Sequence, residues 1–99
     1  MRIEVRDEAR DDIRSALLWY AAQRPGLELE FLDALGDDFD FLLRAPRGAR
    51  RIKGTIRQIP MARFPYQLIH SGEKDVIVIL RVFHNRRDPR TMLRQRRAK

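Results

Sequence analysis

The spacing of the apolar residues changes near residue 44 of this 99-residue chain, and that change constrains the fold more than any other feature. Before it, apolar side chains recur every three or four positions, as on one face of an α-helix. After residue 54 the spacing becomes that of β-strands. The segment 75–84 is apolar on both faces, which is typical of a central strand. The chain therefore predicts helices first and most of a sheet afterwards.

The first half predicts a short strand and two helices. Residues 2–6 alternate between polar and apolar side chains, as in a strand, whereas residues 7–23 and 27–44 have helical spacing. Pro25 disfavours helical geometry at the residue before it, and Gly26 follows. The two helices are therefore expected to form an αα-hairpin.

The second half predicts three strands. Residues 55–61 and 64–70 form two of them, residues 71–74 form a turn, and residues 75–84 form the central strand. Residues 85–99 are a basic tail, expected to form one short helix or no regular structure. The order β-α-α-β-β-β places the chain in the α+β class. A chain of this length has one hydrophobic core, so we expect a single domain over the whole sequence.

Charge is distributed unevenly along the chain. Residues 1–43 hold 5 basic and 11 acidic side chains, a net charge of −6. Residues 44–99 hold 16 basic and 3 acidic side chains, a net charge of +13, and the two halves together give the formal +7. An excess of this size points to an anionic partner, either a nucleic acid or an acidic protein.

Several kinds of site find no support in the sequence. Cysteine is absent, which excludes disulfides, cysteine-based zinc sites and thiol nucleophiles. The glycines are scattered and form no nucleotide-binding motif. Asp37, Asp38 and Asp40 form a small carboxylate cluster, but no histidine stands at a useful spacing from them. We expect these three to form a solvated helix face, and we expect no metal and no cofactor.

The chain also carries no sign of a membrane segment. Its N-terminus is charged and lacks the apolar stretch of a signal peptide. Its longest apolar run, residues 76–80, is far shorter than a bilayer requires. We therefore expect a cytoplasmic protein with no membrane partner.

Four segments, in this order, resemble the RelE/ParE superfamily, the toxins of type II toxin–antitoxin modules. The segments are Glu8-Ala9 with Trp19-Tyr20, Pro25-Gly26-Leu27 with Phe31, Arg63-Phe64-Pro65-Tyr66, and residues 76–81 followed by residues 84–89. The ParE branch, whose members are often described as plasmid stabilisation proteins, is more similar to this chain than the RelE branch is.

The resemblance implies a fold, a partner and a target. The fold is a small twisted, mainly antiparallel sheet with the helical hairpin on one face. The partner is a cognate antitoxin that wraps the toxin and neutralises it. ParE-type members are known as DNA gyrase poisons, so the resemblance predicts a growth inhibitor that acts on gyrase by binding, without catalysis.

An acidic, partly amphipathic antitoxin suits the basic half of the chain, and such a partner lays a helix in a groove or adds a strand to a sheet edge. We expect it to contact the outer face of the helical hairpin and an exposed sheet edge near residues 63–70. The residues expected to bind it are Trp19, Arg63, Tyr66 and Arg81. The simpler interpretation of the aromatic residues in these segments is packing in the core beneath the helices.

The basic tail is the expected target-binding segment. Arginine suits contacts with carboxylates and phosphates, and clustered charge steers association toward an acidic surface. The residues concerned are Arg86, Arg87, Arg90, Arg94, Arg96 and Arg97, followed by Lys99. A solubilising extension is the simpler interpretation of the same residues.

Two other functions remain open at this stage. A RelE-like enzyme cleaves mRNA on the ribosome without a metal ion, which requires a general base, a general acid and cations that stabilise the added phosphate charge. The candidates for these roles are Lys53, Arg63, Arg81 and His84. No tyrosine follows Tyr66, so the C-terminal tyrosine of RelE-like enzymes is missing. The third possibility is a basic nucleic-acid-binding module without toxicity.

Overall fold

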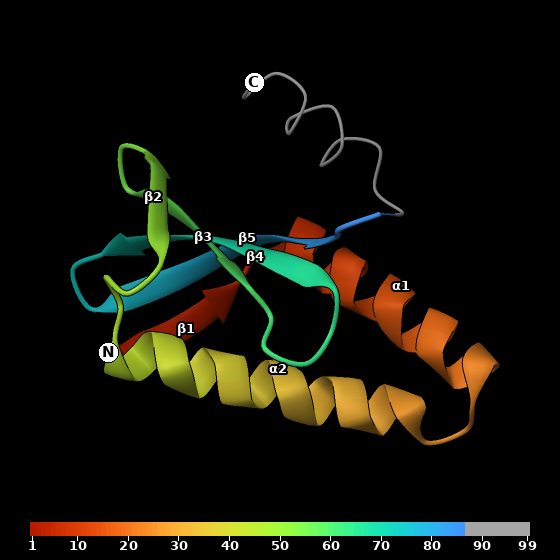
Figure 1. Ribbon diagram of the computed structural model, residues 1–99. Helices are drawn as coiled ribbons and strands as arrows, with labels where there is room; N and C mark the ends of the chain where they lie inside the picture. Colours follow the sequence, from red (N-terminus) through yellow and green to blue (C-terminus); the bar gives the residue numbers. More distant parts are fainter. Residues whose placement is uncertain (87–99) are drawn as a thin grey trace.

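The computed structural model describes residues 1–86, which form a five-stranded sheet with two helices on one face (Figure 1). The elements in chain order are β1 (Arg2–Val5), α1 (Asp7–Gln23), α2 (Leu27–Arg44), β2 (Arg50–Lys53), β3 (Ile56–Pro60), β4 (Tyr66–Glu73) and β5 (Val76–His84). The strands lie in the order β1-β5-β4-β3-β2. Only β1 and β5 are parallel; the other neighbours are antiparallel. The predicted α+β class, helical hairpin and mainly antiparallel sheet are confirmed.

The sheet has one strand more than the sequence predicts. The additional strand, β2, consists of Arg50, Arg51, Ile52 and Lys53, and all four side chains are exposed. No polar–apolar alternation therefore marks it in the sequence. It pairs with β3 and forms one free edge of the sheet. A short, positively charged edge strand discourages pairing with the sheets of other molecules.

The position of β4 corrects two further predictions. The turn expected at residues 71–74 is shorter, because residues 71–73 continue β4 and pair with β5, which leaves only Lys74 and Asp75 in the loop. The exposed sheet edge expected near residues 63–70 does not exist, because β4 lies between β3 and β5. The outermost strands of the described sheet are β1 and β2.

Two residues between the helices determine where α1 ends and α2 begins. Pro25 follows the extended Arg24, whose N–H still donates to the carbonyl of Tyr20. Gly26 then adopts a φ of 95°, a left-handed conformation that glycine reaches without steric cost. Its carbonyl accepts the N–H of Leu29, and its own N–H donates to Glu28 Oε1 at 2.8 Å. This tight turn produces the αα-hairpin that the sequence predicts.

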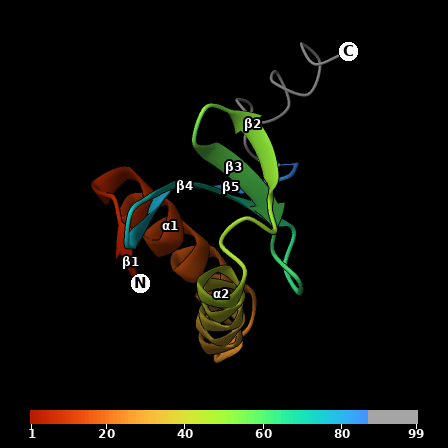
Figure 2. The same cartoon turned by 90° about the vertical axis from the view of Figure 1, so that its left-hand side faces the viewer.

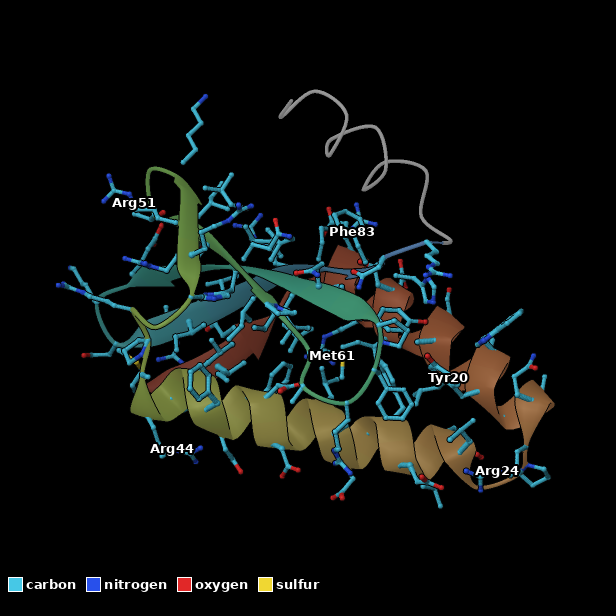
Figure 3. All side chains as sticks on the ribbon, in the orientation of Figure 1. Tyr20, Arg24, Arg44, Arg51, Met61 and Phe83 are labelled. Atoms are coloured by element: carbon cyan, nitrogen blue, oxygen red, sulfur yellow. The ribbon has the colours of Figure 1, made fainter. Side chains whose placement is uncertain are left out.

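The core lies between the helical hairpin and the sheet. Four aromatic rings meet there, from α1 (Tyr20), α2 (Phe31), the β3–β4 loop (Phe64) and β4 (Tyr66). The ring centroids are 5.0–5.4 Å apart in four pairs: Tyr20–Phe31, Tyr20–Phe64, Phe31–Phe64 and Phe31–Tyr66. Figure 3 shows Tyr20 and Met61 between the helices and the strands. These contacts hold one face of the sheet against both helices.

Strands β2 and β3 extend away from the helices. Figure 2 shows them rising as a two-stranded arm above α2. We call residues 50–60 the β2–β3 arm. The arm carries Arg50, Arg51, Lys53 and Arg57, so it presents much of the positive charge of the second half of the chain.

Candidate functional site

Arg81 is held by a carboxylate from α1. Strand β1 pairs with β5 only as far as Ile79, because the chain then enters α1. Beyond that point Asp12 takes the place of a strand: it accepts the backbone N–H of Val82 at 2.9 Å and two N–H groups of Arg81 at 2.8 and 2.9 Å. The Arg81 and Asp12 side chains are only 24% and 14% exposed. The charge of Arg81 is therefore largely neutralised within the molecule.

Sequence reasoning missed the role of Asp12. The carboxylate and Arg81 are 69 positions apart, and no local pattern connects them. In the sequence, Asp12 has the simpler role of an acidic residue near the start of a helix, where the helix dipole favours negative charge.

Arg63 is also paired, but at the surface. It lies in the β3–β4 loop, and its guanidinium is 3.1 Å from an Asp37 oxygen and 3.6 Å from an Asp33 oxygen of α2. All three side chains are exposed. Exposed ion pairs of this kind contribute about 0–1 kcal/mol, so an incoming carboxylate can replace these partners at little cost.

The four residues considered for RNA cleavage are not brought together. Lys53 lies on the outermost strand β2, three inter-strand spacings from β5, or about 14 Å. Arg81 shares a sheet face with Phe83, whose ring centre is 4.6 Å from the guanidinium carbon. Figure 3 shows Phe83 on the side of the sheet away from the helices. His84 is three positions from Arg81 and therefore points to the opposite face.

His84 packs against the core. Its ring meets that of Tyr66 edge-on, with centroids 5.0 Å apart. Its Nδ1 accepts the backbone N–H of Arg86 at 3.0 Å, so the neutral imidazole carries its proton on Nε2. Tyr66 is 4% exposed and belongs to the hydrophobic core, which corrects its predicted place on the antitoxin-binding surface.

One of the three aspartates expected on a solvated helix face is buried. Asp37 and Asp40 are exposed as predicted, but Asp38 lies against the β3–β4 loop and accepts the N–H of Ala62 at 3.3 Å. Its other oxygen has no hydrogen-bond partner among the described residues. Burial raises the pKa of Asp38 above its ordinary 3.8, although the Ala62 N–H partly opposes the shift.

His70 is the second buried titratable group. It lies in β4 opposite Arg57 of β3 and is almost fully buried. Burial lowers the pKa of His70 below its ordinary 6.5, and the charge of Arg57 lowers it further. Its Nε2 atom has no hydrogen-bond partner among the described residues. His70 is therefore a neutral core residue at physiological pH.

Large apolar side chains are exposed around the turn of the helical hairpin. Trp19 is 44% exposed, while its neighbour Tyr20 is buried in the core. Leu18 on the same helix is more exposed still, and Leu29 and Leu32 at the start of α2 are exposed as well. An apolar surface of this kind is typical of a protein-binding site.

The predicted target-binding segment begins at the limit of the described residues. Arg86 follows β5 and is exposed. Arg87, Arg90, Arg94, Arg96 and Arg97 lie outside the described residues. Over residues 1–86, no three residues of the types histidine, cysteine, aspartate and glutamate are placed to hold a metal ion. Nor is any helix in this part of the chain both long and apolar enough to cross a bilayer.

Comparisons with known proteins find a matching family and a similar fold. A family model described as "ParE toxin of type II toxin-antitoxin system, parDE" matches residues 3–89. A solved structure described as "Chromosomal ParDE TA system from P. aeruginosa" is similar in fold, with a TM-score of 0.73. The match has 19% sequence identity and covers 85% of this chain and 95% of the other. No curated protein matches the chain.

Proposed function

The chain belongs to the ParE toxins of type II toxin–antitoxin systems, and from this membership we propose that it stops growth by binding DNA gyrase and is neutralised by a cognate antitoxin. The observation that carries the proposal is the family match, which spans nearly the whole chain. We expect the activity in the cytoplasm, where gyrase and its DNA are found.

The placement of the basic residues favours inhibition by binding over catalysis. Phosphodiester cleavage needs an acid, a base and cations within reach of one phosphate. Arg81 is engaged by Asp12, Arg63 by Asp33 and Asp37, and Lys53 lies at the far edge of the sheet. A binding inhibitor needs no such convergence.

The antitoxin is proposed to cover the exposed apolar residues at the turn of the helical hairpin. Trp19 is accessible there, and Arg63 can exchange its exposed aspartate partners for an acidic group of the antitoxin. Of the four residues predicted to bind the antitoxin, we propose direct contact for these two. Arg81 is largely covered and Tyr66 is almost fully buried, so we propose no direct antitoxin contact for these two.

The test of the proposed function has two parts. Expression of this chain alone in a bacterial host should arrest growth, and co-expression of the antitoxin gene should restore it. With purified components, the toxin should inhibit plasmid supercoiling by gyrase or trap cleaved DNA. Growth that continues normally would exclude toxicity and leave the basic nucleic-acid-binding module as the function.

A RelE-like endonuclease is the second candidate, and the position of His84 favours it. Its imidazole is half-buried at the end of β5, beside the edge of the buried Tyr66 ring, and it is capable of proton transfer. Primer extension on translated mRNA would then reveal cuts within codons, and His84→Ala would abolish them. Under the gyrase hypothesis, growth arrest survives His84→Ala.

A further inference from the structure

A basic cleft lies where the β2–β3 arm meets the β4–β5 turn and the loop after α2. Its volume is about 440 Å³. Four of the nine residues that line it are cations, namely Arg47, Arg51, Arg57 and Lys74, and none is acidic. Glu73 and Asp75 flank Lys74 in the chain but line a neighbouring hollow instead. Figure 3 shows Arg51 on the outer part of the arm.

The four cations of the basic cleft can bind an external anion, because no described carboxylate pairs with them. Among residues 1–86, no carboxylate oxygen lies within 4.0 Å of these four side chains, in contrast to Arg63 and Arg81. Within the described part of the chain, Arg57 is oriented by backbone oxygens alone: it donates to the carbonyl of Ala49 at 2.9 Å and to that of Arg47 at 3.5 Å. A guanidinium held in this way remains positively charged and is already positioned for an anion.

The backbone conformation of Lys74 also supports an anion-binding site in the cleft. It occupies the β4–β5 turn with a φ of 50°, a conformation that glycine and asparagine adopt more readily than lysine. A strained residue persists where the surrounding structure fixes it, and such residues gather at functional sites. Here the strained position places an ammonium group beside the arginines of the cleft.

The rest of the lining fits phosphate groups better than a peptide. Gly54 and Gly72 leave open space where a side chain would stand, and Thr55 supplies a hydroxyl group. Only Met1 and Pro46 are apolar, whereas a bound peptide is usually anchored by apolar side chains in pockets. Arginine, lysine and backbone N–H groups are the usual donors to nucleic-acid phosphates.

We propose that the basic cleft binds the phosphodiester backbone of a nucleic acid. The cleft is separate from the hairpin surface assigned to the antitoxin and from the nuclease candidates Arg63, Arg81 and His84. The inference goes beyond the proposed function, because neither gyrase nor an antitoxin is needed for this binding. It can therefore fail while gyrase inhibition holds, and it can hold while gyrase inhibition fails.

The test measures fluorescence anisotropy of a labelled 20-base-pair DNA duplex and of a labelled 20-nucleotide RNA, with the full chain, between 50 and 200 mM NaCl. The cleft variant combines Arg51→Gln with Lys74→Asn. The matched control combines Arg6→Gln with Arg14→Gln, two exposed positions just after β1 and in α1, with the same change in net charge; β1 and the arm's strand β2 are the opposite edges of the sheet. The two probes show whether DNA or RNA is preferred.

The cleft variant should bind its preferred nucleic acid about tenfold more weakly at 100 mM salt, and the control less than about twofold more weakly. The slope of log K against log salt should become shallower by about 2 in the cleft variant, because two fewer phosphates are neutralised. Because asparagine suits a left-handed turn, the midpoint of thermal unfolding should be unchanged or higher, which separates a binding defect from a folding defect.

Equal losses of affinity in the two variants would overturn the proposal, because binding would then follow net charge alone. A second result would also overturn the proposal: a labelled ten-residue polyglutamate binds the cleft variant more weakly than the wild type, while both nucleic acids bind the two proteins equally. That result would assign the cleft to an acidic peptide.

Discussion

At the scale of single residues, burial shifts the pKa values of two side chains in opposite directions. Burial disfavours the charged form of any titratable group. It therefore raises the pKa of Asp38, whose charged form is the carboxylate, and lowers that of His70, whose charged form is the imidazolium. Both residues should make folding stability depend on pH, each in its own range.

Replacing Asp38 with asparagine should stabilise the protein at neutral pH. The folded-state pKa of Asp38 is raised, so its contribution to stability is largest below the unfolded value of 3.8 and is lost as the pH rises through the folded value. Asp38→Asn keeps an oxygen for the Ala62 N–H and removes the buried charge. We expect a gain of about 1 kcal/mol at pH 7, measured by urea unfolding.

The gain from Asp38→Asn should disappear below about pH 3, where the carboxyl group is mostly protonated in both states. Asp40→Asn, on the exposed side of the same helix, is the control and should change stability little at either pH. A loss of stability in Asp38→Asn at pH 7 would contradict the account, because it would mean that the charged form is the one favoured by folding.

His70 should weaken folding under mildly acidic conditions. Its folded-state pKa is lowered, so its contribution to stability is complete above the unfolded value of 6.5 and is lost as the pH falls toward the folded value. The loss can reach at most about 1.4 kcal/mol per pH unit. Urea unfolding at pH 7.5 and 5.5 should show a larger decrease for the wild type than for His70→Gln. Identical decreases would contradict the prediction.

At the scale of elements, Asp12 joins α1 to the edge of β5. Asp12→Ala leaves both the Arg81 guanidinium and the Val82 N–H without their acceptor. We expect a loss of about 2–4 kcal/mol in the free energy of unfolding. Asp11→Ala is the control, because its pair with Arg14 is 3.4 Å long and exposed, and it should cost less than about 0.5 kcal/mol. Equal effects of the two substitutions would show that Asp12 does not hold the helix.

Helix α2 contains a glycine that its structure does not require. Gly36 lies in the helix interior, and a Cβ atom there would meet no other atom within 4 Å. Gly36→Ala should therefore raise the free energy of unfolding by about 0.5–1 kcal/mol. Gly48→Ala is the contrast, because its Cβ would stand 3.2 Å from the carbonyl oxygen of Ala45, and it should give no gain. Thermal unfolding of the two variants measures the difference.

The elements differ in how far the sequence determines them. Apolar spacing and the Pro25-Gly26 turn were sufficient to predict both helices. The apolar run of β5 was sufficient to predict a strand inside the sheet, although the middle strand is β4. Strand β2 could not be predicted, because all four of its side chains face solvent. Its strand conformation comes from pairing with β3 after the loop at Gly54 reverses the chain.

At the scale of the whole molecule, the fold divides the basic residues into two groups. Arg63 and Arg81 are neutralised by carboxylates of the acidic first half, whereas Arg47, Arg51, Arg57 and Lys74 are not. The charge excess of the second half was evident in the sequence. The division was not, because these ion pairs join residues 26 and 69 positions apart.

The candidate antitoxin-binding site could be predicted from the sequence only in part. Trp19 and Arg63, which were predicted from the sequence as antitoxin contacts, both have exposed side chains. The face to which each β4 side chain points, and with it the burial of Tyr66, depends on strand register, and the register of β4 on β5 shifts at a β-bulge between Ile69 and His70. A one-residue shift in a strand moves every later side chain to the other face.

The central claim is that this toxin inhibits by binding, and the most direct test is a titration of purified gyrase. Supercoiling is measured at a fixed gyrase concentration, well above the dissociation constant, with increasing toxin. The account predicts that inhibition grows linearly and is complete near one toxin per gyrase active site, and that added antitoxin reverses it. Complete inhibition by a small fraction of that amount of toxin would contradict the account. Full supercoiling at excess toxin, together with cleavage of translated mRNA, would also contradict it.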